Sequence, residues 1–417
     1  MRSDGSFFKE FKKYFTVFKL NNTDTQGTRT DIGYFDSSGI KVPRYLNEYW
    51  TSKQRQSNPL HEISYRACYK AELPGFFISL FSKEKDIIYD PFSGRGTTAI
   101  EAALLNRNII ANDINPLSTV ISKPRLFIPT LAEVEARLNE IKFTKKLKAD
   151  IDLSMFYHSE TESEIVSLRK YLINKNKNGN EDYADSWIRM VATNRLTGHS
   201  TNFFSTYTLP PNQAVSQERQ KKINLQRSQT PTYKNVKFIL LKKTRELTSG
   251  LNPRLIAQLK SIGSNAAFLK EDARNTSVIK SKSVQLTVTS PPFLDVINYA
   301  DDNWLRCWFN KIDAKAIAKK ISITGSLDNW KKIMEAVFIE LYRITRNEGF
   351  VAFEVGEIKK GKIKLDEHVV PLGINAGFKC LGIIINQQKF TKTASIWGIN
   401  NNVFGTNTNR IVMFRKE

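Results

Sequence analysis

The segment DIIYDPFSGRGTTAIEAALLNRNIIANDIN, residues 86–115, contains a complete alternation of secondary structures. An apolar run at 86–92 predicts a strand, and the turn SGRGTT follows it. AIEAALLNRN, at 99–108, has apolar residues at helical spacing, and a second strand is predicted at 109–115. A strand, a tight turn, a helix and a strand in this order join two parallel strands. The segment therefore predicts an α/β fold with a mostly parallel, Rossmann-like sheet.

The turn in this segment has the pattern GxGxxA, beginning at Gly94 and Gly96. Backbone N–H groups at the start of the following helix face whatever binds there. Asp113 comes 19 residues after Gly94, at the end of the next strand, where a carboxylate can accept hydrogen bonds from ribose hydroxyls. No lysine follows the second glycine, so the turn is not a P-loop. Both a nicotinamide cofactor and S-adenosylmethionine fit this pattern.

The residues before the glycines favour S-adenosylmethionine. Asp90 can hold an ammonium group, and Phe92 can cover a cation or an adenine ring. A dinucleotide site would need open space there for its pyrophosphate. The predicted cofactor-binding residues of this loop and the next strand are Asp90, Pro91, Phe92, Ser93, Gly94, Gly96, Thr97, Thr98, Asp113 and Ile114.

A second motif, TSPPF, ends an apolar strand at residues 289–293. Pro291 and Pro292 remove two N–H donors and fix two φ angles, so no strand pairing continues through them. The result is a stiff turn with Ser290 on one side and Phe293 on the other.

Together these motifs resemble the S-adenosylmethionine-dependent DNA amino-methyltransferases of restriction-modification systems. DPFSGRGTTAIEAALLNRNIIANDINP resembles their cofactor motif, and TSPPF resembles their catalytic motif. EDARN, at 271–275, is similar to the segment that contacts the adenine of the cofactor, which implies that Asp272 and Ala273 bind it. The resemblance covers about residues 61–120 and 265–417. The order of the motifs resembles the α arrangement of these enzymes.

The chemistry of amine methylation explains the stiff turn. An exocyclic amine attacks a methyl group in line only if its two hydrogens are held by acceptors, which directs the lone pair toward the sulfonium. Ser290 Oγ and the carbonyl of Pro291 are the predicted acceptors, Pro292 stiffens the turn, and Phe293 is expected to stack on a base flipped out of the duplex. These four residues are the predicted catalytic set.

Cytosine N4 and adenine N6 are chemically alike as methyl acceptors. In the resembling enzymes a serine at the position of Ser290 is more usual for cytosine N4, so we expect cytosine N4, with adenine N6 as the alternative. Cytosine C5 is excluded, because that chemistry needs a Pro-Cys nucleophile and none of the three cysteines follows a proline. Two more distant alternatives are an RNA guanine-N2 methyltransferase and a nucleic-acid-binding protein without activity.

The charge predicts a polyanionic partner. The chain has 63 Lys and Arg against 41 Asp and Glu, a formal net charge of +22. A surplus of this size usually binds nucleic acid, so double-stranded DNA is the expected partner, with a cognate restriction endonuclease implied by the resemblance. Residues 216–245 contain nine Lys and Arg and one acidic residue. The expected DNA contacts there are Arg219, Lys221, Lys222, Arg227, Lys242 and Lys243.

Four parts are expected along the chain. They are an N-terminal extension at 1–50, a first catalytic part at 51–130, a basic and largely helical target-recognition insert at 131–264, and a second catalytic part at 265–417. Helical patterns are also predicted at 63–81 and 330–345, and a strand at 349–357. The four histidines show no metal-ligand spacing, so no metal is expected. No apolar run spans a membrane and no signal peptide is recognised, so the expected location is the prokaryotic cytoplasm, associated with the nucleoid.

Overall fold

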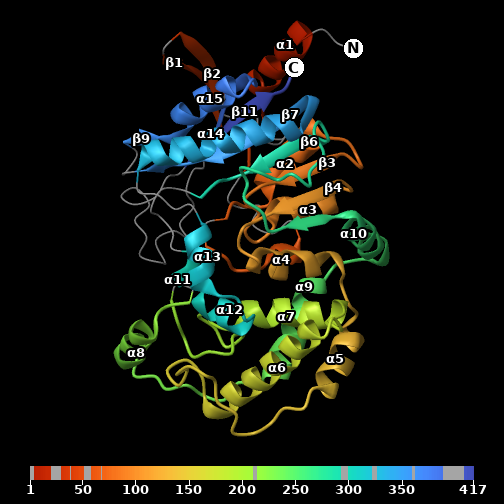
Figure 1. Ribbon diagram of the computed structural model, residues 1–417, viewed down its shortest axis with the longest axis vertical. Helices are drawn as coiled ribbons and strands as arrows, with labels where there is room; N and C mark the ends of the chain where they lie inside the picture. Colours follow the sequence, from red (N-terminus) through yellow and green to blue (C-terminus); the bar gives the residue numbers. More distant parts are fainter. Residues whose placement is uncertain are drawn as a thin grey trace.

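The computed structural model describes residues 4–19, 30–37, 39–50, 58–66, 68–209, 214–292, 299–321, 326–358, 362–387 and 408–417. Their centre is a nine-stranded sheet with the order β1-β2-β10-β11-β7-β6-β3-β4-β5 (Figure 1). The strands are β1 Asp31–Ser37, β2 Ile40–Asn47, β3 Ile87–Asp90, β4 Asn108–Asn112, β5 Ala267–Leu269, β6 Val284–Thr289, β7 Thr345–Val355, β10 Lys379–Gln387 and β11 Thr408–Arg415. A separate pair joins β8 Glu357–Ile358 to β9 Ile363–Lys364.

The central strands are parallel and buried on both faces. β6 pairs in parallel with β3 and β7, β3 with β4, and β4 with β5, whereas β11 is antiparallel to both of its neighbours. Every residue of β6 is buried, which is why its sequence VQLTVT does not alternate strictly between polar and apolar residues. The predicted α/β fold with a mostly parallel Rossmann-like sheet is confirmed.

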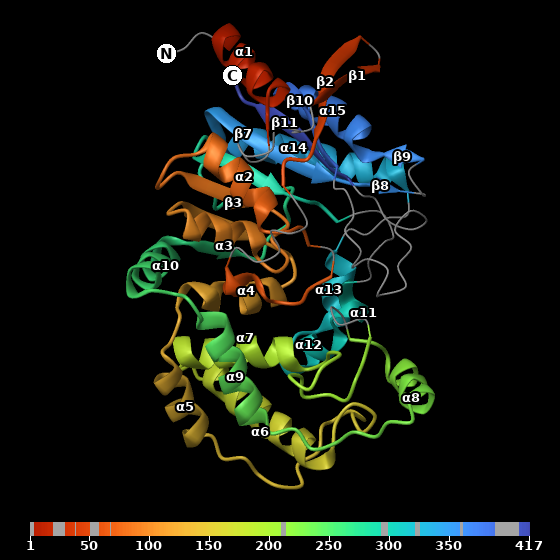
Figure 2. The ribbon, with the colours of Figure 1, turned by 180° about the vertical axis from the view of Figure 1, so that it is seen from behind.

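Helices cover both faces of the sheet. On one face lie α1 Asp4–Thr16, α2 Glu72–Phe81, α3 Thr97–Leu104 and α10 Pro253–Asn265, whose apolar residues form one core cluster. On the other face lie α14 Leu327–Ile344 and α15 Leu365–Asn375, which form a second cluster with β7, β10 and β11. The sheet is thus the middle layer of three (Figures 1 and 2).

The remaining helices form a unit beyond the side of the sheet where α4 Leu117–Ser122 lies. They are α5 Leu131–Glu140, α6 Ser159–Lys177, α7 Tyr183–Arg195, α8 Gln217–Gln226 and α9 Val236–Thr248, with α11 Tyr299–Asp302, α12 Trp304–Phe309 and α13 Ala314–Lys320 extending toward them (Figure 2). The Arg169 guanidinium of α6 donates to the Trp308 carbonyl at 2.9 Å, and the Trp304 indole N–H donates to the Val215 carbonyl at 3.1 Å. The chain therefore passes through this helical unit twice, before β5 and again after the TSPPF motif.

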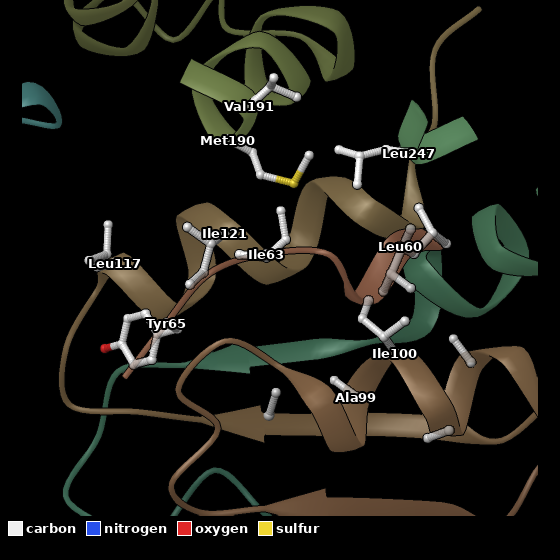
Figure 3. Packing of buried hydrophobic residues seen from close by; sticks show 14 of the residues in the cluster. Leu60, Ile63, Tyr65, Ala99, Ile100, Leu117, Ile121, Met190, Val191 and Leu247 are labelled. Carbon is white, nitrogen blue, oxygen red and sulfur yellow. The ribbon is translucent and has the colours of Figure 1, made fainter. Parts of the chain in front are cut away.

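Two layers of apolar side chains join the helical unit to the sheet. Met190 and Val191 of α7 and Leu247 of α9 face α4 Leu117–Ser122 and the segment at 60–65 (Figure 3). On its other side that segment faces α3, so the two units share one continuous core.

Three sequence-based boundaries differ in the structure. The first fifty residues are not a separate extension, because α1 packs Phe11 and Phe15 into the core and β2 pairs in parallel with β10. The helix expected at 63–81 begins only at Glu72. α10 packs against α3 and β4, with Gly263 against Phe127, so the helical unit ends near Thr248 and not at residue 264.

Candidate active site

The glycine turn connects β3 to α3 and has a left-handed backbone at two positions. Gly94 has a φ of +50° and Gly96 a φ of +77°. A Cβ at Gly96 would also lie 2.5 Å from the Cβ of Ser122 in α4. A side chain at Gly96 is therefore excluded by packing as well as by backbone conformation, and this lets α4 approach the start of α3.

Asp113 follows β4 and holds the turn from the side. Its Oδ2 accepts the Gly94 N–H at 2.8 Å, and its Oδ1 accepts the Asn115 N–H at 2.9 Å. Burial raises the pKa of the Asp113 carboxyl to about 6, although these two N–H groups favour the ionised form. Each carboxylate oxygen has a further lone pair that can accept a hydroxyl hydrogen.

Asp90 has a different position from the one that its sequence context suggests. Its carboxylate is 2% exposed and accepts hydrogen bonds from the Thr289 hydroxyl at 2.6 Å, the Tyr69 hydroxyl at 3.1 Å and the Phe92 N–H at 3.1 Å. Burial raises its pKa to about 6, and these donors act in the opposite direction. Asp90 lies beneath the pocket described below and ties the end of β3 to the end of β6.

The same contacts bring the TSPPF motif beside the glycine turn, although the two are almost two hundred residues apart in sequence. Thr98, in the first turn of α3, donates from Oγ1 to the Val288 carbonyl at 3.1 Å. The Trp330 indole N–H of α14 donates to the Pro292 carbonyl at 3.1 Å. Ser290 and Pro292 are thereby held at the carboxyl edge of the sheet, where ligands bind in this kind of fold.

A single pocket joins the two motifs. The predicted site residues that line it are Pro91, Phe92, Ser93, Gly94, Thr97, Asp113, Ile114, Asp272, Ala273, Ser290 and Pro292. Asp90, Gly96, Thr98 and Pro291 do not line it; the first three shape the turn from behind. Phe293 lies outside the described residues.

Several lining residues were not predicted from the sequence. They are Tyr65, Cys68, Tyr69, Arg95, Asn115, Glu271, Arg274, Lys320, Ile321, Trp330, Ile333, Met334 and Val337. Most come from the segment before α2 or from α14, which reach the site only through tertiary packing. Only Arg95 could have been predicted from the sequence, because it lies inside the glycine motif. Its guanidinium donates to the carbonyls of Ile63 and Tyr69 and holds that segment over the turn.

The pocket fits an adenosine-containing cofactor. Ser93 Oγ is buried on its wall and has no hydrogen-bond partner, so a donor or acceptor is available beside the turn. The carboxylate of Asp113 suits ribose hydroxyls. Ile333, Met334 and Val337 of α14 supply an apolar wall for a ring.

Comparison with known families agrees with this geometry. The family described as DNA methylase matches residues 3–122, which include α1, the first strands, the glycine turn and Asp113. Residues 3–122 are therefore similar to the DNA methylase family. S-adenosylmethionine is accordingly the cofactor. The match begins at residue 3, so the similarity to this family includes most of the first fifty residues. The sequence motifs had indicated that the resemblance begins only near residue 61. A second family, described as RMKL-like methyltransferase domain, matches residues 79–175.

Individual relatives are more distant. The chain is 23% identical over 323 residues to the type II methyltransferase M.BsoBI of Geobacillus stearothermophilus, which covers 70% of this chain and 60% of that protein. The chain thus spans about three fifths of the curated relative. Among solved structures, TrmN of Thermus thermophilus is 11% identical, with a TM-score of 0.32 over 84% of this chain and 50% of TrmN. The rRNA methyltransferase AviRa of Streptomyces viridochromogenes is 9% identical, with a TM-score of 0.34 over 86% of this chain and 89% of AviRa.

The basic residues expected to contact DNA fall into two groups in the structure. Arg219, Lys221 and Lys222 are exposed on α8, and Arg227, also exposed, lies at its end over the Tyr207 ring. The other group belongs to α9 and points inward.

Lys243 is the clear exception among the expected DNA contacts. It is 5% exposed and forms ion pairs with Glu62 at 2.7 Å and Glu246 at 3.3 Å, so it belongs to the interior and is not a DNA contact. Lys242 is half-buried and donates to the Asn202 side chain at 2.8 Å. Sequence could not separate them from α8, because the side of a helix that packs inward depends on its neighbours.

Neither a metal site nor a membrane-spanning helix is found among the described residues. No cluster of three or more metal-ligating side chains occurs among these residues. No helix within them is long and apolar enough to cross a membrane.

Proposed function

We propose that the chain is a site-specific DNA methyltransferase that transfers the methyl group of S-adenosylmethionine to an exocyclic amine, with cytosine N4 as the acceptor. One observation carries the proposal: Ser290 and Pro292 line the same pocket as Gly94 and Asp113. A cofactor held by the glycine turn therefore has its reactive end near the stiff, acceptor-bearing TSPPF turn. The proposal agrees with the DNA methylase match and with the type II methyltransferase relative.

Different residues bind the cofactor and the target amine. Asp113 accepts ribose hydroxyls, the α14 wall covers the adenine ring, and the methionine part lies along the glycine turn. The bound cofactor supplies an electrophilic methyl group. Ser290 Oγ and the Pro291 carbonyl accept the two amine hydrogens, so the lone pair of the nitrogen is free to attack. Phe293 supplies a stacking face for the flipped base.

The Pro292 carbonyl is not the second acceptor for the amine hydrogens. It already accepts the Trp330 indole N–H, and this bond fixes the orientation of the turn. The carbonyl of Pro291 remains the proposed partner of Ser290 Oγ. Trp330 therefore stiffens the turn from the α14 side while the two prolines stiffen it from within.

The choice of cytosine N4 over adenine N6 rests on Ser290. Serine is a short, neutral acceptor, which suits an amine on a single-ring pyrimidine, whereas adenine-specific relatives more usually have Asp or Asn there. The basic surface of α8 is proposed to contact DNA phosphates. A restriction endonuclease of the same specificity is the proposed partner in the cell.

The decisive experiment identifies the methylated nucleoside. The purified protein is incubated with labelled S-adenosylmethionine and either unmethylated DNA or tRNA, and the products are digested and analysed by mass spectrometry. N4-methylcytosine in DNA is expected. N6-methyladenine in DNA would overturn only the choice of base, whereas label in tRNA guanine and none in DNA would support the RNA methyltransferase alternative.

A further inference from the structure

A buried carboxylate lies directly beside the TSPPF turn and is not used by the function proposed so far. Glu354, near the end of β7, is 7% exposed. β6 and β7 are parallel with Thr289 opposite Phe353, so the next residues of the two strands are Ser290 and Glu354. This register places the Ser290 hydroxyl beside the Glu354 carboxylate, and hydrogen bonding from Ser290 favours the ionised form of that carboxylate. On its other side, the Asn409 side-chain N–H of β11 donates to Glu354 Oε1 at 3.1 Å.

Burial of a carboxylate costs free energy, and few polar partners offset that cost for Glu354. Removing an ionised carboxylate from water is unfavourable unless it is paired or well supplied with hydrogen bonds. Within the described part of the chain, no lysine or arginine forms an ion pair with Glu354, and the partners recorded for it are Ser290 and Asn409. Burial accordingly raises its pKa above the usual value. A glutamine or an apolar residue would be the less costly choice at a purely structural position.

The chemistry of a serine hydroxyl suggests the reason. A hydroxyl has one hydrogen to donate and two lone pairs that accept, and its rotation decides which of these faces a ligand. If the Ser290 hydrogen turned toward the amine, it would repel the amine hydrogens and compete for the nitrogen lone pair. An acceptor behind Ser290 removes that orientation, because the hydrogen is already engaged.

We propose that Glu354 is a positioning residue that takes the hydroxyl hydrogen of Ser290 and so presents the Ser290 lone pairs to the amine of the target base. Asn409 holds the carboxylate in place from the next strand. This inference rests on the proposed amine methylation and specifies how its first acceptor is oriented. Glu354 itself does not contact the base.

The test is a double-mutant cycle in the methyl-transfer assay with unmethylated DNA. Glu354→Gln keeps the size of the side chain but can turn an N–H toward Ser290, and it is expected to lower kcat by about 100-fold, as loss of a preorganised polar contact does elsewhere. The dissociation constant for S-adenosylmethionine should change by less than about 3-fold, as for other variants that leave the cofactor contacts intact. In a Ser290→Ala background, Glu354→Gln should have no further effect, because the hydroxyl that it orients is gone.

Glu340→Gln is the matched control. Glu340 is also buried and hydrogen-bonded, to Thr276 and Arg343, but it does not line the pocket, so its variant should retain kcat once folded. If Glu354→Gln does not bind cofactor, Glu354→Asp replaces it in the cycle, since it keeps the charge but is too short to reach both Ser290 and Asn409.

The outcomes separate the two levels of the proposal. Wild-type kcat in the Glu354 variant, or effects of Glu354 and Ser290 that multiply in the double variant, would overturn the role of Glu354 and leave the proposed function standing. Absence of methyl transfer to DNA by the wild-type protein would overturn the proposed function itself.

Discussion

At the scale of single residues, the carboxylates of the site differ more than their sequence contexts suggest. Asp90 and Asp113 both end parallel strands, and burial raises the pKa of each to about 6. Asp90 is bonded to a hydroxyl of β6 and to Tyr69, whereas Asp113 lines the pocket. The first therefore stabilises the turn, and the second is available to a ligand.

Cofactor binding should depend on pH through Asp113. Because its pKa is about 6, the carboxyl is mostly ionised at pH 7 and mostly protonated at pH 5, where it loses an acceptor for the ribose hydroxyls. We expect the dissociation constant of S-adenosylmethionine to rise as the pH falls from 7 to 5, measured by calorimetry. Asp113→Asn should bind more weakly at pH 7 and show a smaller change with pH, and an unchanged pH dependence in this variant would contradict the assignment.

Gly96 allows a comparison that isolates packing from backbone strain. Gly96→Ala must adopt a φ of +77° and also place its Cβ against Ser122, whereas Gly39→Ala adopts a φ of +79° with no atom within 4 Å of the new Cβ. Left-handed strain costs about 1–2 kcal/mol, and overpacking adds about 1–3 kcal/mol. Denaturant unfolding should therefore show a larger loss of stability for Gly96→Ala than for Gly39→Ala. Equal losses would mean that α4 moves aside freely.

At the scale of elements, α8 is the strongest candidate for contact with DNA. It carries three exposed cations, Arg219, Lys221 and Lys222, on a helix with little burial, whereas α9 uses Lys243 inside the fold. The helical unit to which both belong is tied to the chain that follows TSPPF. A base held at Ser290 and a backbone held at α8 would therefore be bound by connected parts of the protein.

Replacing the three α8 cations by glutamine should weaken DNA binding in a salt-dependent way. Each lost phosphate contact lowers the slope of log affinity against log salt by about 0.9, so the slope should fall by as much as about 3 in fluorescence titrations at several salt concentrations. The matched control replaces Lys9, Lys12 and Lys13, which are exposed on α1 at the opposite end of the molecule (Figure 1). If both triple variants lose the same slope, α8 acts only through net charge.

At the scale of the whole molecule, the helical unit and the sheet should unfold together. Leu247, Met190 and Val191 share one core with the segment at 60–65, which in turn packs on α3 (Figure 3). We expect a single calorimetric transition, with hydrogen exchange in β6 and α7 protected to a similar free energy. Leu247→Ala should lower the stability of both regions by about 2–5 kcal/mol. Loss of protection in α7 alone would show two independent units.

The residues from 86 to 115 were enough to predict the parallel sheet, the glycine turn and the cofactor, since strand, turn and helix signals there are local and adjacent in the chain. Ser290 and Asp113 could likewise be named, because each ends a strand beside a recognisable motif. The contacts of these residues with distant parts of the chain could not be predicted from local motifs. Trp330, Tyr65 and Glu354 reach the site through strand register and helix packing across long separations, and no local pattern marks them.

Dependence on tertiary packing also explains why the predictions for residues 1–50 and for Lys243 were wrong. Residues 1–50 contain too few periodic apolar positions to predict a place in the sheet, yet β2 finds its partner in β10, more than three hundred residues away. Lys221 and Lys243 each belong to a Lys-Lys pair of the same basic stretch, but Lys243 forms an ion pair with Glu62 in the interior. Composition and local periodicity predict which elements form, whereas burial depends on which surfaces meet, and that is a property of the folded chain.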